Sequence, residues 1–455
     1  MVKDANSGKR RRTGLWIVAL FLVIVAGGAI YLSTLLPIIT GYAAKNLGSA
    51  VFVQERNADE VDSTDLNFSF IKFTKSKVNT SDSTVVSRFL WGRSKAIFRD
   101  ELGVTLLRKT SEKELMNNVY PDIPEPCYDR DTLAWPMGNI IPDTATGIDH
   151  AALSEITKKL VTDNGYGGNT FAFIVLHKGI PVAEAYKPQF SRDTRFLSWS
   201  MAKSVINGLA GVMVKEEGFD INRPADVEEW KNDERKNITV NDLMRMQSGL
   251  EWNEDYGSRS DVNVMLFCRK DMAAYVRDRK QEFPAGKHWE YSSGSSNLVS
   301  WLMRKHLGND SAYYTFPHTR FFHRIGITDA VFEADPSGTY IGSSYLYATA
   351  RDYARFALLY QNDGFFNGEQ IFPEGWVNYT REPVSSGNGE YGSLFWLYGS
   401  GEVPSAPKDI FMCQGHDGQR IFIMPSQELI VVVLGYSPRG TLDFDALVKD
   451  IVATI

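Results

Sequence analysis

The sequence predicts an α+β fold in which helices cover an antiparallel sheet. Two β-hairpins are expected after residue 145: residues 170–177 and 182–186 flank Lys178-Gly179, and residues 420–424 and 429–434 flank residues 425–428. Helical periodicity occupies the region between these hairpins, and residues 444–455 are typical of a short final helix. Strands at both ends with helices between them favour one sheet covered by helices.

An uncharged apolar segment near the N-terminus predicts one transmembrane helix before this fold. Residues 13–44 carry no charge, and residues 15–39 are predominantly apolar. About 20 such residues cross a ~30 Å hydrocarbon core, since a helix rises ~1.5 Å per residue. A cleaved signal peptide is the alternative, with Gly41-Tyr-Ala-Ala44 as a site for the peptidase, but its apolar region is usually only about 7–15 residues long. We therefore expect a retained single-pass anchor at residues 15–39.

Basic residues around this segment predict its orientation. Clustered lysine and arginine resist translocation, so the more basic flank stays in the cytoplasm. We expect residues 1–14 to be a cytoplasmic tail, residues 15–39 to lie in the cell (inner) membrane, and the catalytic domain to be periplasmic or extracellular. Two basic residues, Lys45 and Arg56, follow the segment, and five precede it: Lys3, Lys9, Arg10, Arg11 and Arg12.

The composition excludes several other classes of protein. With 43% apolar and 23% charged residues, the chain has the composition of a globular protein, and a net charge of −6 gives no reason to expect nucleic acid. Three cysteines, Cys127, Cys268 and Cys413, allow at most one disulfide, which the spacing does not identify. The seven histidines show no metal-binding spacing, so neither a metal nor another cofactor is expected.

Residues 40–145 are expected to form an N-terminal extension, a spacer packed against the main domain. Residues 51–53, 66–73 and 85–86 favour short strands, separated by polar turns such as residues 79–84. The proline-rich residues 121–126 are typical of a stiffened connector. The main domain is then expected at residues 146–455.

The main domain contains a Ser-x-x-Lys pattern, Ser200-Met-Ala-Lys203, at the start of an amphipathic run that ends near Gly218. A serine hydroxyl needs a proton acceptor to become a nucleophile, and a lysine three residues later lies on the same face of a helix. Ser200 would also lie near a helix N-terminus, where the dipole and free N–H groups favour developing negative charge. The alternative is a surface serine on an ordinary core helix.

The same spacing occurs at Ser69 and Ser405 in less suitable contexts. Ser69 lies among alternating apolar residues that suggest a strand, in which residues i and i+3 point to opposite faces. Ser405 precedes Pro407, which resists helix formation. Only Ser200 therefore combines the spacing with a helical context.

Two further motifs follow Ser200 in the chain. Tyr291-Ser292-Ser293 precedes a predicted helix, and His416-Asp417-Gly418 opens a predicted strand. The order Ser-x-x-Lys, Tyr-x-Ser, His-x-Gly resembles that of the β-lactamase-related serine hydrolases, which include class C β-lactamases, D,D-peptidases, family VIII esterases and 6-aminohexanoate-dimer hydrolases. Residues 253–256, Asn-Glu-Asp-Tyr, are most similar to the last group. The resemblance covers roughly residues 145–455.

This resemblance implies a β-lactamase/transpeptidase-like fold: an antiparallel sheet flanked by helices, with a helical subdomain and the active site in the groove between them. It implies that Ser200 is the acylated nucleophile and that Lys203 and Tyr291 share the proton transfers. Which of the two is the base stays open.

The resemblance also implies roles around the nucleophile. Ser293 would hold the substrate or the lysine, and His416 and Gly418 would bind substrate. The backbone N–H groups of Ser200 and Gln419 would form the oxyanion hole, in which a donor is typically worth roughly 3–4 kcal/mol. His416 stands where many β-lactamases carry a lysine, which weakens the expectation that the site binds the carboxylate of penicillin-like substrates.

Other residues are weaker candidates. Three aromatic residues are possible walls of a substrate pocket, although aromatic side chains more often belong to a core: Tyr256, Tyr391 and Trp396. Three acids are expected to be solvated loop residues: Glu254, Asp255 and Asp261. Cys413 is expected to be a buried packing residue.

The sequence therefore favours a membrane-anchored serine hydrolase that cleaves amide or ester bonds of a small substrate. Within this class an esterase or 6-aminohexanoate-type amidase ranks above a D,D-peptidase or β-lactamase-like enzyme acting on cell-wall peptides. The alternative outside this class is a catalytically silent sensor or binding module. A silent descendant has no chemical need of Ser200, Lys203 and Tyr291 together, which favours the enzyme.

Overall fold

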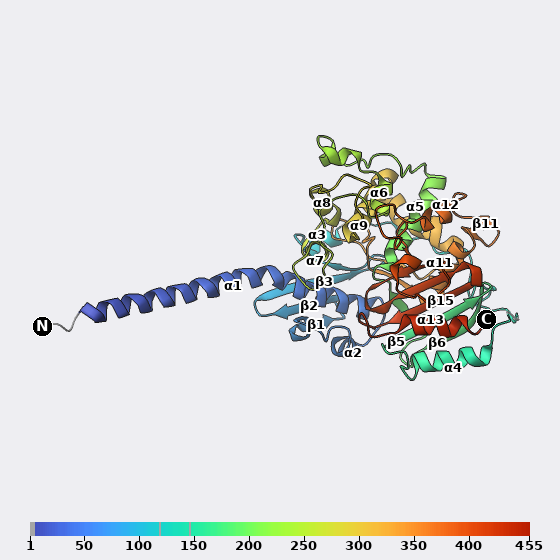
Figure 1. The fold of residues 1–455 in the computed structure, drawn as a ribbon, viewed down its shortest axis with the longest axis horizontal. Helices are drawn as coiled ribbons and strands as arrows, with labels where there is room; N and C mark the ends of the chain where they lie inside the picture. Colours follow the sequence, from blue (N-terminus) through green and yellow to red (C-terminus); the bar gives the residue numbers. More distant parts are fainter. Residues whose placement is uncertain (1–4, 118–119, 145–146) are drawn as a thin grey trace.

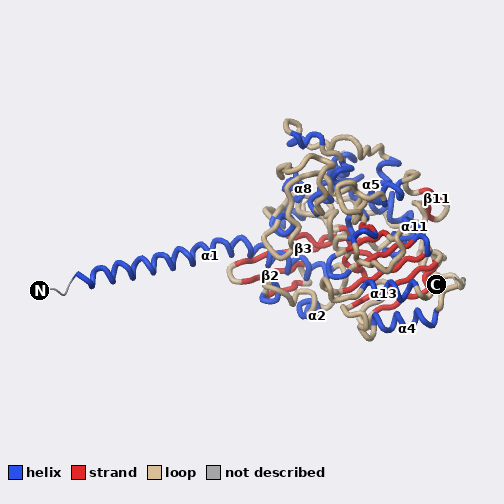
Figure 2. Tube along the Cα trace, viewed as in Figure 1, coloured by secondary structure: helices blue, strands red, loops and turns tan. Residues whose placement is uncertain are grey.

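A six-stranded antiparallel sheet forms the centre of the main domain (Figures 1 and 2). The computed structural model describes residues 5–117, 120–144 and 147–455. Both predicted hairpins are confirmed and lie in this sheet, next to each other through the pairing of β15 with β5. In spatial order the strands are β12 (Trp396–Leu397), β13 (Phe411–Gln414), β14 (Arg420–Met424), β15 (Leu429–Gly435), β5 (Thr170–His177) and β6 (Ile180–Tyr186).

Alternating side chains of this sheet enter two separate hydrophobic clusters. Val431 and Val433 of β15 pack with α4 (His150–Val161) and α13 (Phe444–Val452) on one face. Ile430 and Val432 enter the larger cluster on the other face, beneath α11 (Ala350–Gln361). Because successive residues of a strand point to opposite faces, an uninterrupted apolar strand is what a sheet covered on both sides requires. The predicted α+β arrangement, including the final helix, is confirmed.

The helical part of the main domain lies beyond the face covered by α11, and in Figure 2 it gathers above the strands. A small antiparallel sheet has the strand order β7-β9-β8, and its strand β7 immediately precedes helix α5 in the chain. Its strands are β7 (Arg195–Leu197), β8 (Val331–Phe332) and β9 (Leu346–Thr349), and β10 (Phe365–Phe366) pairs with β11 (Glu369–Gln370). The helices are α5 (Met201–Glu216), α6 (Val240–Met244), α7 (Asp261–Cys268), α8 (Met272–Arg277), α9 (Ser293–Leu307), α10 (Asp310–Phe316) and α12 (Trp376–Arg381).

The N-terminal apolar segment belongs to one long helix, α1 (Ala5–Phe52), which projects from the body of the molecule in Figure 1. Residues 15–52 are long and apolar enough to cross a membrane. From Leu36 onward, however, the helix is packed into the protein, against α7 and a four-stranded antiparallel sheet. That sheet contains β1 (Lys75–Asn79), β2 (Thr84–Phe89), β3 (Gly92–Arg99) and β4 (Gly103–Leu106), and the short helices of this region are α2 (Ala58–Ser63) and α3 (Glu112–Met116).

Two strand predictions in the N-terminal extension are wrong. Residues 51 and 52 end α1, and residue 53 follows in a turn; residues 66–73 form turns and a short 3₁₀ helix, with Ser69 in the left-handed region at φ 45°. Residues 85–86 do belong to a strand, β2. Short apolar runs cannot distinguish a strand from the end of a buried helix, and here the packing of α1 decides the outcome.

A buried ion pair joins α1 to the main domain. The Lys45 ammonium donates to the Glu333 carboxylate, which also accepts from the Ser49 hydroxyl at 2.8 Å and the Val104 N–H at 2.6 Å. The side chains of Lys45 and Glu333 are 3% and 0% exposed. Three segments, α1, β4 and the residue after β8, therefore meet at one fully hydrogen-bonded carboxylate.

Replacing one partner of this pair should destabilise the protein strongly. Glu333→Ala leaves the Lys45 ammonium buried without a counter-charge, and we expect a loss of about 3–5 kcal/mol of unfolding free energy. Denaturation of the detergent-solubilised full chain measures this loss. Glu228→Ala, which removes an exposed ion pair with Lys231, is the matched control and should change stability little. Equal stability of the two variants would show that the buried pair does not hold α1.

Candidate active site

Ser200 lies at the N-terminal end of α5, where the sequence places it. Trp199 immediately before it is held in the left-handed region at φ 45°, which turns the chain sharply from β7 into the helix. Ser200 is half-buried, and within the described residues its N–H donates to no protein acceptor. The end of a 16-residue helix thus presents a free N–H group and the positive end of the helix dipole next to the hydroxyl.

Lys203 is buried one turn further along α5, with 1% of its surface exposed. Its Nζ donates to Ser200 Oγ at 3.0 Å, to Ser293 Oγ at 3.0 Å and to the Ser343 carbonyl at 3.2 Å. Burial lowers the pKa of Lys203 from 10.5 to about 8, while the Glu254 carboxylate acts in the opposite direction. A substantial fraction of this lysine is therefore neutral slightly above neutral pH and can accept a proton from Ser200.

Tyr291 lies beside the same two residues. The Lys203 Nζ is 4.8 Å from the centre of the Tyr291 ring. Burial and the Glu254 carboxylate raise the pKa of Tyr291 well above its ordinary value, and a hydrogen bond with Ser200 offsets this only in part. Tyr291 is accordingly a neutral phenol at ordinary pH, which leaves Lys203 as the better proton acceptor.

The sequence reasoning missed two residues of this cluster, Glu254 and Ser343, whose carbonyl accepts from Lys203. Glu254 was expected to be a solvated loop acid, but its carboxylate accepts from the Ser293 N–H at 2.9 Å and also from the Ser293 hydroxyl. The Trp252 indole N–H and the Tyr256 hydroxyl donate to it as well, at 2.6 and 3.1 Å. Because Lys203 donates to the same Ser293 hydroxyl, a continuous chain of hydrogen bonds runs from Glu254 through Ser293 and Lys203 to Ser200.

The two neighbouring acids have structural roles. Asp255 is exposed and accepts from the Gly257 N–H, as expected for a loop acid. Asp261 pairs with Arg279 at 3.2 Å and accepts from the Tyr275 hydroxyl at 2.5 Å, so it is an ion-pair residue rather than a freely solvated one. The sequence distinguishes none of the three acids from the others, because their environments depend on segments distant in the chain.

The His416 ring contacts both Tyr256 and Trp199, the residue that precedes Ser200. The rings of His416 and Tyr256 stack with centroids 5.4 Å apart, and those of His416 and Trp199 make a T-shaped contact, also at 5.4 Å. The His416 side chain is 42% exposed, and its Nε2 lies 3.3 Å from the Asp417 carboxylate. Trp199 thus links the strained turn before Ser200 to the third motif.

Tyr391 and Trp396 pack against Tyr291. Their centroids lie 5.9 and 5.3 Å from that of Tyr291, and Tyr391 is fully buried while Trp396 is half-buried. Trp396 also lines a surface cavity with Gln414, His416 and Arg420. Tyr391 is therefore a buried neighbour of Tyr291, whereas Trp396 contacts both Tyr291 and this cavity.

The turn between β13 and β14 holds the third motif close to α5. Gly415 approaches the Ser198 carbonyl, and Gly418, at φ 83°, approaches Ser437 so closely that a Cβ atom would clash at either position. The Gln419 side chain exchanges two hydrogen bonds with the Gly435 backbone, at 2.6 and 3.0 Å. The backbone N–H of Gln419, the second expected oxyanion donor, makes only a long hydrogen bond to the His416 carbonyl, at 3.5 Å. Such a long bond is weak, so little energy would be lost if this N–H donated to a substrate oxygen instead.

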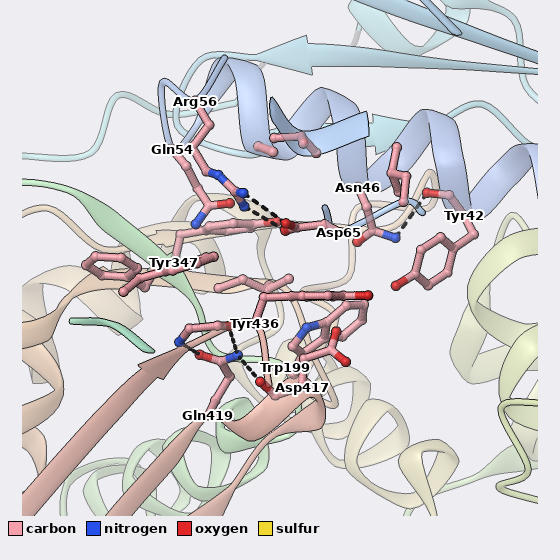
Figure 3. A pocket seen from close by; sticks show the side chains of 17 residues that line it. Tyr42, Asn46, Gln54, Arg56, Asp65, Trp199, Tyr347, Asp417, Gln419 and Tyr436 are labelled. Atoms are coloured by element: carbon pink, nitrogen blue, oxygen red, sulfur yellow. Dashed lines mark hydrogen bonds and ion pairs between the residues drawn. The ribbon is translucent and has the colours of Figure 1, made fainter. Parts of the chain in front are cut away.

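A second cavity, lined by Trp199, lies between α1 and the main domain (Figure 3). In Figure 3, Tyr42 and Asn46 of α1 and the Arg56–Asp65 pair lie across this cavity from Trp199, Asp417 and Gln419. Tyr42 stacks on Trp199 with centroids 6.2 Å apart. The N-terminal extension is therefore in direct contact with the residue that precedes Ser200.

The other candidates do not gather here. Ser405 donates its hydroxyl to Asp445, and Cys413 is fully buried, as expected for a packing residue. Within the described residues the three cysteines are unpaired, and no group of three His, Cys, Asp or Glu side chains is placed to hold a metal.

Known proteins share this fold. The chain is 24% identical over 301 residues to the 6-aminohexanoate-dimer hydrolase of Paenarthrobacter ureafaciens, an alignment that covers 59% of this chain and 73% of that protein. Among solved structures, a putative 6-aminohexanoate-dimer hydrolase from Bacillus anthracis superposes with a TM-score of 0.55 at 23% identity, covering 65% of this chain and 80% of the other. A penicillin-binding protein homologue from Caulobacter crescentus gives a TM-score of 0.56 at 16% identity, covering 69% and 99%.

These likenesses confirm the predicted β-lactamase/transpeptidase-like fold. The family model described as Beta-lactamase matches residues 156–449, well over half of the chain, and this range contains all three motifs. Members of that family are serine hydrolases. The chain belongs to the Beta-lactamase family.

Proposed function

We propose that this protein is a membrane-anchored serine hydrolase that cleaves an amide or ester bond of a small substrate through a Ser200 acyl-enzyme. The observation that carries the proposal is the buried Lys203, whose Nζ lies 3.0 Å from Ser200 Oγ and whose pKa is lowered to about 8. A lysine in this state is a base within hydrogen-bond distance of the serine that it would activate. Hydrolysis through an acyl-enzyme requires such a base, whereas a lysine that only packs in the core does not need to contact a serine hydroxyl.

The proposed reaction begins when neutral Lys203 takes the proton of Ser200 Oγ as that oxygen attacks the substrate carbonyl. The N–H groups of Ser200 and Gln419 would stabilise the resulting oxyanion. Tyr291, which is protonated, would give its proton to the leaving amine or alcohol and regain one from Lys203. Water then attacks the acyl-enzyme with Lys203 again as the base, which releases the acid and restores Ser200.

The surroundings of Ser200 support a small substrate with an apolar chain. Aromatic rings of Tyr256, His416 and Trp396 border the site, and the cavity lined by His416 and Trp396 also carries the charged side chains of Arg420 and Glu402. We therefore rank an ester or a 6-aminohexanoate-type amide, whose reacting bond is flanked by an apolar chain, above a cell-wall peptide or a β-lactam. The likeness to a 6-aminohexanoate-dimer hydrolase supports the same choice. A silent sensor or binding module is disfavoured because the hydrogen-bonded chain from Glu254 to Ser200 is complete.

The anchor is supported by the way α1 continues into the main domain. Ala44 and Lys45, where a signal peptidase could cut, are buried in the middle of a helix and are 0% and 3% exposed. Cutting there would divide the helix at the ion pair with Glu333. We infer that the helix is retained, with its basic end in the cytoplasm and the catalytic domain on the far side of the cell membrane.

Ser200→Ala should abolish both ester turnover and labelling by a fluorophosphonate probe. Ser405→Ala is the matched control, since Ser405 has the same Ser-x-x-Lys spacing, and it should label and turn over like the wild type. Peptide mapping identifies the labelled serine. Undiminished labelling of Ser200→Ala would refute the assignment of Ser200 as the nucleophile.

A panel of substrates ranks the possible substrate classes. The panel contains esters, short amides including the 6-aminohexanoate dimer, peptidoglycan fragments and nitrocefin.

The pH dependence of acylation should report Lys203. Because the base is the neutral amine, kcat/KM for an ester should rise with pH through about 8 and then level off. Lys203→Ala and Tyr291→Phe should each lower turnover by at least ~100-fold. Near-normal turnover in either variant would remove that residue from the mechanism.

Glu254→Gln should move this pH profile to lower pH. The Glu254 carboxylate raises the pKa of Lys203, so removing its charge makes the ammonium easier to deprotonate. Glu251→Gln removes an exposed charge from the same loop and should leave the inflection in place. An unchanged inflection in Glu254→Gln would mean that Glu254 does not act on the lysine.

Fractionation tests the anchor. The full chain should stay in the membrane pellet after carbonate extraction, and alkaline phosphatase fused after Ile455 should be active. A soluble mature protein that begins near Ala44 would instead identify the apolar segment as a signal peptide.

A further inference from the structure

Five large apolar side chains lie exposed where α1 leaves the protein. Phe70 and Phe73 precede β1, Leu90 and Trp91 form the turn between β2 and β3, and Phe68 lies beside Tyr42. We call them the apolar collar; their exposed fractions are 37% for Phe68, 58% for Phe70, 54% for Phe73, 61% for Leu90 and 59% for Trp91. A cluster of this kind on a water-facing surface marks an interaction site.

The turn at the tip of the collar contains residues that are unusual for a β-hairpin. Phe89 pairs with Gly92, so Leu90 and Trp91 form a two-residue hairpin loop, and Leu90 has φ 50°. Such loops favour Asn, Asp and Gly, which tolerate positive φ and face water. Phe70 and Phe73 pack against Phe89 with centroids 6.5 and 6.3 Å away, which holds the collar together as one surface.

The collar is level with the end of the exposed part of α1. The Trp91 indole N–H donates to the Ser33 hydroxyl at 3.0 Å, and Leu36, three residues later, is the first fully buried residue of the helix. Residues 15–35 precede that point, and 21 helical residues are about 31 Å long, the thickness of a hydrocarbon core. A bilayer crossed by this segment would therefore have its interface at the height of the collar.

Positive charges lie beside the collar. Cross-strand pairing places Lys75 opposite Arg88 and Arg88 opposite Arg93, in one row across β1, β2 and β3. Among the described residues no carboxylate pairs with any of the three. Like charges directly opposite one another destabilise a sheet unless something external neutralises them. The adjacent Ser94 faces α1 through a bond with Thr40, so alternation puts the cation row on the outer face of the sheet.

We propose that the apolar collar and the row of Lys75, Arg88 and Arg93 dock onto the anionic lipid surface of the membrane that α1 crosses. Aromatic side chains favour the interface between hydrocarbon and water, and lysine and arginine favour acidic headgroups. This inference rests on the proposed anchor and goes beyond it: the catalytic domain lies on the bilayer rather than swinging on a tether. Tyr42, which contacts Trp199, is only about 9 Å along the helix from Leu36, so docking holds the active site near the headgroups.

Spin labels on the full chain in phosphatidylglycerol-containing vesicles test the docking. Leu90→Cys is labelled in a Cys127→Ser, Cys268→Ser background, with Ile24→Cys in the helix and Phe365→Cys, also an exposed apolar position, as references. At position 90 we expect accessibility to a water-soluble nickel relaxant at least about threefold lower than at position 365, with higher accessibility to oxygen. Ester turnover of the labelled variants confirms that they are folded.

The outcomes separate docking from anchoring. A label that is in hydrocarbon at position 24 but as aqueous at position 90 as at position 365 would overturn docking and leave the anchor intact. An aqueous label at position 24 would overturn both. A label at position 90 that is shielded from both relaxants would point to a protein partner and would also overturn docking. In a triple variant that combines Lys75→Gln, Arg88→Gln and Arg93→Gln, the accessibility of position 90 to nickel should rise toward that of position 365. An unchanged accessibility would show that the three cations do not contribute to docking.

Discussion

The burial of the Lys203 ammonium is the constraint on which the active site depends. A buried cation is unfavourable unless its donors are satisfied, and here Ser200, Ser293 and the Ser343 carbonyl accept from it. Desolvation lowers the pKa of Lys203. The Glu254 carboxylate, which is connected to Lys203 through two hydrogen bonds of the Ser293 hydroxyl, partly offsets this decrease. Because these effects oppose each other, Lys203 can be either charged or neutral near physiological pH. A base that must take up and release a proton in each catalytic cycle requires this property.

Each acceptor comes from a different part of the fold, which explains why the site needs the whole domain. Ser200 lies at the start of α5, Ser293 at the start of α9, Ser343 before β9 and Glu254 in the loop before α7. The central sheet and α11 fix these segments relative to one another. From the other side, Tyr42 of α1 stacks on Trp199, so α1 also contacts the turn that precedes Ser200.

Much of this arrangement follows from local patterns in the sequence. Alternation and turn residues predicted both hairpins, and the Ser-x-x-Lys spacing at Ser200 identified a lysine, Lys203, that does contact this serine. Glu254 was missed because nothing in Asn253-Glu-Asp-Tyr256 shows that Ser293 will donate to it twice. Lys45 was similarly counted only as a basic residue that follows the apolar segment, since its partner Glu333 lies 288 residues away. Interactions between distant segments decide whether a charged residue is solvated or buried, and no local pattern contains them.

The proposed mechanism depends on the pKa of Lys203, which burial away from water lowers. A ¹³C NMR titration of lysine side chains in the solubilised full chain, with the Lys203 signal assigned by its loss in Lys203→Arg, measures this directly. Lys203 is expected to titrate near pH 8, the value to which burial lowers its pKa. A Lys203 that titrates at its ordinary value of 10.5 would contradict its role as the base, since it would be charged at working pH and could not accept the Ser200 proton.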